Sequence, residues 1–275
     1  MTHSPASLAS GAIPGWVWMC LMACGLLTVL KWATWRSAAD RLPAVLTVGY
    51  FLAWPGLNAA SFVGTSPDVA RPRAREWAGP LLYLLAGLGI VWWLCPVVGQ
   101  LDSTYAGMLG FAGLILFLHF GLFSVLALLW RRAGYDIRPI MNAPMRAASL
   151  LDFWSRRWNI AFRDAANQLI VRRFQRRLGP RTAAMLVFLV SGLVHELVIT
   201  LPAGAGYGGP TLYFLIQAAG VGIQRLPVTR AWGLDRGLAG RVVTGVFLIA
   251  PVGFLFPSEF FEGVMAPFLD AIGAR

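Results

Sequence analysis

Two histidines inside apolar stretches are the side chains best suited to chemistry in this sequence. His195 lies in the stretch SGLVHEL, and His119 lies in the stretch FLHF. A neutral imidazole can take a proton from a hydroxyl group near neutral pH, which is the task of a general base. An ionisable side chain in an apolar helix is costly, so it marks either a functional site or a hydrogen bond between helices. Both interpretations remain open for each histidine.

His195 has the neighbours that favour catalysis. In a helix, Ser191 and Gly192 lie one turn before it and leave a small, polar surface beside the imidazole. A neighbouring helix, a water molecule or a substrate can approach such a surface. Glu196 follows directly and lies about 100° further around a helix. We expect His195 to be the general base, and Ser191, Glu196 and His119 to contribute to substrate binding.

Asn159 ends a dense aromatic and basic stretch, DFWSRRWN, at residues 152–159. A buried asparagine must find hydrogen-bond partners, and its amide can donate to a carbonyl or an oxyanion. Asn159 is therefore the second candidate catalytic residue. Trp154 and Trp158 are four residues apart, so helical spacing predicts that they share one face. There they would bind substrate or anchor the segment at a membrane interface.

The charges of the same stretch suggest recognition of an anion. Arg156 and Arg157 are candidates for binding the phosphates of coenzyme A. Asp152 precedes Arg156 by four residues, so an α-helix would pair them. The wider segment 131–181 is rich in arginine and has apolar residues at helical spacings, which predicts basic amphipathic helices at the cytoplasmic face. Binding of lipid headgroups and docking of an anionic substrate both fit this segment.

The composition indicates a membrane protein that crosses the bilayer several times. Hydrophobic residues make up 57% of the 275 residues and charged residues only 13%, with a mean hydropathy of +0.65. One aqueous core cannot hide so much apolar surface, which excludes the disordered, fibrous and disulfide-rich secreted classes. The net charge of +11 comes from basic residues that flank apolar runs. This arrangement is typical of membrane topology, so we expect no nucleic acid partner.

The apolar runs predict an all-α bundle of about six to eight crossings, with the N-terminus outside the cytoplasm. Basic clusters alternate with uncharged loops, and six crossings place every basic cluster on one side. We expect 42–57, which prolines and glycines interrupt, to be a partial insertion, and the tail at 260–272 to lie at the interface. Six runs are expected to span the membrane: 16–30, 79–99, 105–130, 182–201, 211–224 and 241–256.

We expect one membrane-embedded domain over residues 1–275. Within it, N-terminal helices occupy 14–130, the amphipathic segment occupies 131–181, and C-terminal helices with the candidate histidine occupy 182–257. The cysteines are isolated in apolar runs, and no second histidine follows His195 at the spacing of a zinc protease, because that position is Ile199. The sequence therefore predicts no metal site and no tightly bound cofactor.

Two blocks of this sequence resemble the wax-synthase-like branch of the membrane-bound O-acyltransferase family. The blocks are LLDFWSRRWN and, about 35 residues later, FLVSGLVHEL, and the similarity runs over roughly residues 110–225. The resemblance implies an enzyme that transfers an acyl group from acyl-CoA to a hydroxyl acceptor. In that family the catalytic histidine falls on His195 and a second polar residue falls on Asn159. The family generally has a longer chain with more spans, so the resemblance implies a compact version.

The resemblance also sets the expected partners and location. Acyl-CoA would be the cosubstrate, and a lipid or small-molecule alcohol would be the acceptor, within a multi-pass protein that contacts membrane lipids. We expect the bacterial inner membrane as its site. The alternative is a transporter or lipid-translocating protein without covalent chemistry, in which a broken segment such as 42–57 would gate a path.

Overall fold

The computed structural model describes residues 13–64 and 69–275, and the regular secondary structure in these ranges is helical. Five helical segments are long and apolar enough to cross a membrane. They are Gly15–Trp35, Ala74–Gly99, Ser103–Arg132, Ile160–Ala203 and Gly237–Leu255. This confirms the prediction of an all-α polytopic membrane protein. His3 lies outside the described residues.

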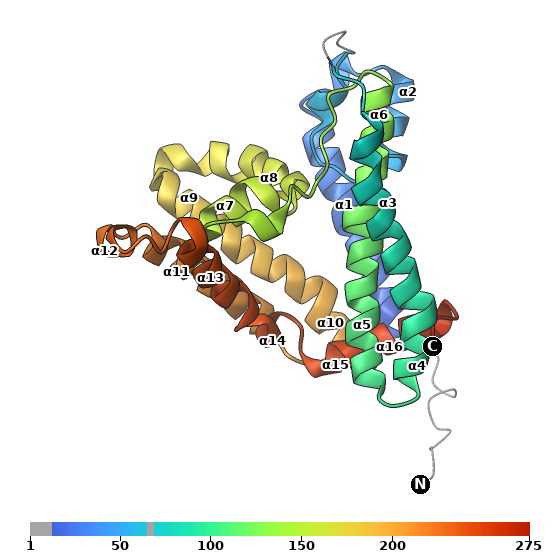
Figure 1. Ribbon diagram of the computed structural model, residues 1–275. Coiled ribbons are helices and arrows are strands. Elements are labelled where there is room, and N and C mark those ends of the chain that lie inside the picture. Colours follow the sequence, from blue (N-terminus) through green and yellow to red (C-terminus); the bar gives the residue numbers. More distant parts are fainter. Residues whose placement is uncertain (1–12, 65–68) are drawn as a thin grey trace.

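A first group of helices packs through glycines. It contains α3 (Ala74–Gly89), which continues into α4 (Cys95–Gly99), and α5 (Ser103–Ile115), which continues into α6 (Phe123–Arg132). Figure 1 shows these helices standing together as one upright bundle. A Cβ atom on Gly87 would lie 2.6 Å from the backbone oxygen of Gly113. Such close backbone contact is how helices associate in lipid, where the hydrophobic effect between them is absent.

A second group is inclined to the first and carries the candidate histidine. It contains α9 (Arg172–His195), α11 (Gly209–Gln224) and α13 (Gly237–Ile249), and α11 packs against both of the others. Figure 1 shows the two groups diverging from the region of α10 (Leu201–Ala203) and α15 (Ser258–Phe260). α1 (Gly15–Trp35) joins them, because it contacts α10 and the turn that follows His195.

The amphipathic segment and the span that carries His195 are continuous rather than separate. α8 (Ile160–Ala166) runs through a π-helical stretch, Asn167–Val171, into α9. The chain bends inside α9 at Gly179, whose φ of 78° places it in the left-handed region. Pro180 follows and has no N–H to continue the hydrogen-bond ladder. The boundary predicted between 181 and 182 is therefore a kink within one long helix.

The interrupted segment 42–57 forms only a short helix, α2 (Ala44–Leu52). Nine residues of helix span less than half of a bilayer core. Lys31, which is 2% exposed, ties the segment to α1. Its Nζ donates to the backbone oxygens of Tyr50 (2.6 Å) and Gly56 (3.1 Å). Burial also raises the pKa of the Tyr50 hydroxyl to about 12. The short helix cannot cross the membrane by itself, and the partial insertion of the segment stays a prediction.

The C-terminal tail packs into the protein instead of lying on its surface. It consists of α15, a π-helical stretch, Phe261–Met265, and α16 (Ala266–Ala271). Val264 and Leu269 are fully buried. Two glycines of α5 make room for the tail, since a Cβ on Gly107 would lie 2.8 Å from the oxygen of Phe261. Sequence reasoning did not indicate this complementary glycine surface, and the place of the tail at the membrane interface stays a prediction.

Candidate functional site

His195 is the last residue of α9, where the helix changes its pitch. The next five residues, Glu196–Thr200, form a π-helical turn. Such turns are rare, are concentrated at functional sites, and redirect the side chains around them. Gly192 lies one turn before His195, and a Cβ on it would lie 2.6 Å from the Cα of Thr211. The small surface predicted beside His195 is thus where α11 makes its close approach.

A backbone carbonyl fixes the protonation pattern of the His195 ring. The Nδ1 atom lies 2.7 Å from the backbone oxygen of Ser191. A carbonyl oxygen can only accept, so Nδ1 carries the hydrogen and donates it. In the neutral ring Nε2 then holds the lone pair. Nε2 has no hydrogen-bond partner among the described residues, and the side chain is half-buried rather than sealed. This is the orientation that a general base needs.

Ser191 acts through its backbone and not through its hydroxyl. Its Oγ donates to the backbone oxygen of Val187 at 2.8 Å, and the residue is 6% exposed. The hydroxyl is therefore committed to its own helix. The sequence predicted Ser191 beside His195, and in the structure it is the backbone carbonyl of Ser191 that contacts the ring.

Aromatic rings form one wall of the site. Phe214 of α11 has its ring centroid 4.7 Å from that of His195. The ring centroid of Trp154 lies 5.6 Å from that of Phe214 and 6.0 Å from that of Phe188 of α9. The Trp154 Nε1 atom is buried and has no hydrogen-bond partner in the described part of the chain. A buried donor without a partner is unusual and is a candidate to bind a ligand.

Glu196 faces α11 rather than open space. Its Oε1 accepts from the backbone N–H (3.1 Å) and the hydroxyl (2.9 Å) of Thr211. Its Oε2 accepts from the hydroxyl of Thr200 (2.5 Å) and the backbone N–H of Gly208 (3.2 Å). Both carboxylate oxygens are thus occupied by protein donors. The candidate substrate-binding role for Glu196 has no free acceptor to support it.

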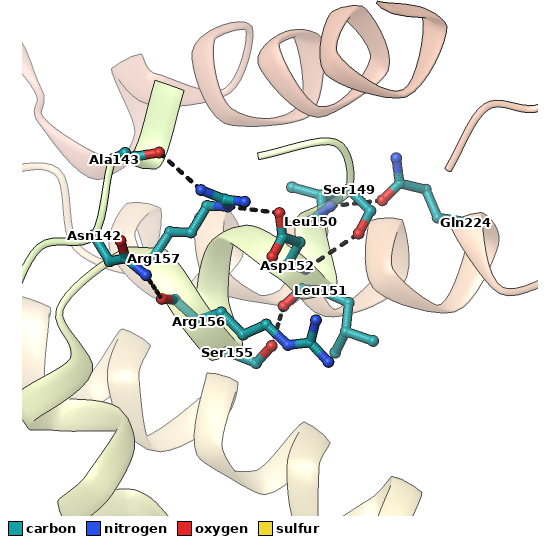
Figure 2. A network of polar contacts seen from close by, with 10 residues as sticks. All are labelled: Asn142, Ala143, Ser149, Leu150, Leu151, Asp152, Ser155, Arg156, Arg157 and Gln224. Carbon is teal, nitrogen blue, oxygen red and sulfur yellow. Dashed lines mark hydrogen bonds and ion pairs between the residues drawn. The ribbon is translucent and has the colours of Figure 1, made fainter. Parts of the chain in front are cut away.

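The stretch 152–159 does not form the α-helix that the spacing predicts. Phe153–Arg157 is π-helical, with a wider turn than an α-helix. Consequently Asp152 pairs with Arg157, five residues on, at 2.6 Å, and the predicted pairing with Arg156 is wrong. Figure 2 shows this pair and the hydrogen bond at 3.2 Å from Arg157 to the backbone oxygen of Ala143.

The two arginines therefore differ in freedom. Arg157 is held by Asp152 and Ala143, and its side chain is 23% exposed. Arg156 is exposed, and its side chain makes no ion pair with the described residues. Only its backbone oxygen is used, by the amide of Asn142 at 3.3 Å (Figure 2). Of the two, Arg156 is the one available to a phosphate.

Trp154 and Trp158 both contact the ring of Phe153, with centroids 5.0 and 5.5 Å apart, but otherwise pack toward different groups of helices. Trp154 packs toward α9 and α11, as described above. Trp158 stacks on Phe153 with centroids 5.5 Å apart and planes at 15°, and lies 6.4 Å from Phe120 of the first group. The helix ends before Trp158, whose extended backbone (φ of −99° and ψ of 129°) takes its ring out of the four-residue repeat.

Asn159 terminates this turn in the left-handed region, with φ of 41°. Asparagine tolerates this conformation better than most residues. Its Oδ1 accepts from the backbone N–H of Phe162 at 3.2 Å and caps α8. Its amide donors have no partner among the described residues, and it makes no hydrogen bond to His195 there. The structure thus gives Asn159 a capping role and leaves its amide N–H groups free.

His119 belongs to the first group of helices. It lies in the π-helical stretch Leu116–Leu122, and its ring meets Phe123 at 5.4 Å between centroids. Its Nδ1 is buried without a hydrogen-bond partner in the described residues. No contact joins it to His195 within these residues, so the structure does not bring the two histidines into one site. No cluster of three metal-binding side chains occurs in the described ranges.

Two residues of this site, Phe214 and Thr211, were not predicted from the sequence. Both lie in α11, and their contacts with α9 join positions 15 or more residues apart. Only the Ser191–Gly192 pair carried a signal, because small residues predict a close approach without naming the approaching helix.

The region that builds this site is similar to known acyltransferases. Residues 137–216 match the model of the membrane bound O-acyl transferase family. The chain is 33% identical over 145 residues to the probable long-chain-alcohol O-fatty-acyltransferase 3 of Arabidopsis thaliana. The aligned region covers 48% of this chain and 42% of that protein. It is 44% identical over 73 residues to the probable long-chain-alcohol O-fatty-acyltransferase 1 of the same plant. This alignment covers 24% of this chain and 21% of that protein.

A third relative extends the same pattern. The long-chain-alcohol O-fatty-acyltransferase of Simmondsia chinensis is 30% identical over 135 residues, which covers 45% of this chain and 38% of that protein. The chain therefore matches less than half the length of each of these relatives. The resemblance read from the two sequence blocks is confirmed, while these plant proteins give no support for a bacterial inner membrane.

Proposed function

We propose that this chain is a membrane-embedded O-acyltransferase that moves an acyl group from acyl-CoA to the hydroxyl of an alcohol, with His195 as general base. The matched segment 137–216 contains His195, Trp154 and Asn159. The relatives are named for transfer of fatty acyl groups to long-chain alcohols, and we propose an acceptor of that class here. No tightly bound cofactor takes part in the proposed reaction.

The observation that carries the proposal is the contact between His195 Nδ1 and the Ser191 carbonyl. At 2.7 Å it fixes the hydrogen on Nδ1 and leaves the Nε2 lone pair available. The acceptor hydroxyl gives its proton to Nε2 as its oxygen attacks the thioester carbonyl carbon. The tetrahedral intermediate then expels the thiolate as the C–S bond breaks. The protonated imidazole returns the proton to the sulfur, so that ester, free coenzyme A and neutral His195 result.

Two donors could stabilise the oxyanion of that intermediate. The Trp154 N–H is buried and unpaired within the described residues, two aromatic contacts away from His195. The Asn159 amide is free, although its oxygen caps α8. A preorganised donor of this kind is worth about 10²–10³ in rate. We assign the role to Trp154 first, because its N–H is already buried away from water.

An apolar cavity provides a place for a hydrocarbon chain. It has a volume of about 140 Å³ and lies between α1 and the α8–α9 helix. Val190 and Val194 form its wall on α9, Ala165 and Phe162 its wall on α8, and Leu26 its wall on α1. Val194 directly precedes His195. We propose that part of the acyl chain occupies this cavity.

Exposed arginines provide a dock for the phosphates of acyl-CoA. Arg156 is free, and α9 begins with further exposed arginines that make no ion pair in the described residues. These are Arg172, Arg173, Arg176, Arg177 and Arg181. Guanidinium groups suit phosphate oxygens, and the same groups can also bind anionic lipid headgroups.

The test is a product balance on the purified protein in lipid nanodiscs. Labelled fatty acyl-CoA and a long-chain alcohol should yield labelled ester and free coenzyme A thiol in a ratio of one to one. Nanodiscs without the protein provide the blank. Thiol release without ester would indicate hydrolysis. Movement of lipid across the vesicle membrane without either product would favour the transporter. Hydrolysis and lipid movement without products would each overturn the proposal.

A further inference from the structure

The residue after the proposed base holds the start of α11. Helix N-termini leave backbone N–H groups without partners inside the helix. In α11 the N–H of Gly208 and that of Thr211 both donate to the carboxylate of Glu196. Gly209 donates to the oxygen of Gly206 at 3.1 Å, and Pro210 has no N–H to satisfy. Glu196 therefore completes the cap of a helix to which it does not belong.

The charge of Glu196 suits this position. A carboxylate at a helix N-terminus interacts favourably with the helix dipole. Charge-assisted hydrogen bonds to backbone N–H groups are also stronger than neutral ones. α11 has no side-chain cap of its own, since its N-cap residue is Gly208 with φ of 83°. Its first turn therefore depends on an acceptor supplied by α9.

The same turn of α11 reaches the catalytic ring. Gly192 packs against the backbone of Thr211, so the two helices meet without a side chain between them. Phe214 follows Thr211 by one helical turn and contacts the His195 ring at 4.7 Å between centroids. The contact between Glu196 and Thr211 thus sets the place where Phe214 meets His195.

We propose that Glu196 is a positioning residue: by capping α11 it holds Phe214 against His195 and keeps Nε2 directed toward the reacting hydroxyl. This inference rests on the proposed acyltransferase function. Glu196 touches neither substrate nor the transferred proton in this scheme. Its effect passes through the start of α11, at Gly208 and Thr211, to Phe214.

The kinetic test compares Glu196→Gln, Glu196→Ala and Thr211→Val. We expect Glu196→Ala to lower kcat about 100-fold and Glu196→Gln about tenfold, because glutamine keeps one acceptor for the Thr211 N–H. The KM for acyl-CoA and for alcohol should stay within about twofold, since no substrate contact is lost. Glu262→Gln is the matched control, because Glu262 also accepts from a threonine hydroxyl (Thr104, 2.9 Å) far along the chain from the site.

A double-mutant cycle shows whether the effect passes through Thr211. Glu196→Ala and Thr211→Val should be strongly non-additive in kcat, because Glu196→Ala already removes the acceptor of the Thr211 hydroxyl. The same cycle is measured on thermal unfolding, which needs no activity. Coupling in unfolding without ester formation by the wild type would overturn the proposed function and leave the cap intact.

Three results would overturn the inference itself. Additive effects of the two substitutions would separate Glu196 from Thr211. A rise in the KM for either substrate with unchanged kcat would make Glu196 a binding residue. A rate for Glu196→Gln as low as that of Glu196→Ala, in a protein that unfolds at the wild-type temperature, would require the negative charge itself in the reaction.

Discussion

His195 and His119 have similar sequence surroundings, but their rings have different hydrogen-bonding environments in the fold. Both lie in apolar helices, and a π-helical stretch adjoins or contains each of them. His195 has Nδ1 bonded to a carbonyl one turn earlier, and its ring is open enough to be reached. His119 has Nδ1 buried without a partner among the described residues. The hydrogen bond at Nδ1 thus distinguishes the candidate base, His195, from His119.

The largest difference should come from replacing each of the two histidines by alanine in turn. His195→Ala should lower kcat by about 10²–10⁴, the usual contribution of a general base. His119→Ala should change kcat by less than about threefold, because no contact joins it to the site in the described residues. The measurement is the initial rate of ester formation by each variant at equal amounts of folded protein. Equal losses for both would erase the distinction drawn here.

Trp154 sharpens the comparison within the second group of helices. Trp154→Phe removes the unpaired N–H and keeps most of the aromatic packing against Phe188 and Phe214. We expect kcat to fall by about 10²-fold, as for loss of one oxyanion donor. Trp158→Phe is the control, because the ring contacts of Trp158 in the described residues are with Phe153 and Phe120 and not with Phe188 or Phe214. If both variants kept the wild-type kcat, the oxyanion role would pass to Asn159.

The cavity beside α9 should set the acyl chain length. Ala165→Leu would fill space within the cavity of about 140 Å³. We expect the preference, expressed as kcat/KM across a series of acyl-CoA donors, to shift about tenfold toward shorter chains. A thermal unfolding scan accompanies the assay, because overpacking costs about 1–3 kcal/mol. An unchanged chain-length profile in a stable variant would place the chain elsewhere.

The smallest effects should separate the two arginines. Arg156→Ala should raise the KM for acyl-CoA by about threefold and leave the unfolding temperature unchanged, since its side chain has no partner in the described residues. Arg157→Ala should instead lower stability by about 1–3 kcal/mol, because Asp152 loses its partner. Thermal scans and donor titrations measure both. The reverse pattern would contradict the roles assigned from Figure 2.

Hydropathy was sufficient for five of the six predicted spans, whereas the run 211–224 forms α11, a 16-residue helix that is not among the five helices long enough to cross. The role of His195 as general base stays a prediction. The apolar runs predicted most of the crossing helices, and the small residues before His195 predicted a close helix contact. The α-helical repeat failed between Asp152 and Arg157, because the backbone there is π-helical and becomes extended at Trp158. Nothing in local spacing marks an extra residue in a turn, so that error could not be avoided.

Long-range contacts account for what else was missed. The role of Glu196 depends on donors in Gly208 and Thr211, which follow it by 12 and 15 residues. Helix capping is recognisable in a sequence when the cap lies next to its helix. Here the acceptor comes from the preceding helix, so only the folded structure reveals the partner.

The tautomer of His195 is the central claim, and nitrogen-15 NMR measures it directly. The protein is labelled at histidine, of which the chain has only three, and His195→Asn identifies the signals. At neutral pH we expect a neutral His195 ring with hydrogen on Nδ1 and none on Nε2. A ring that carries its hydrogen on Nε2, or one that is doubly protonated at that pH, would contradict it, because no lone pair would then face the hydroxyl.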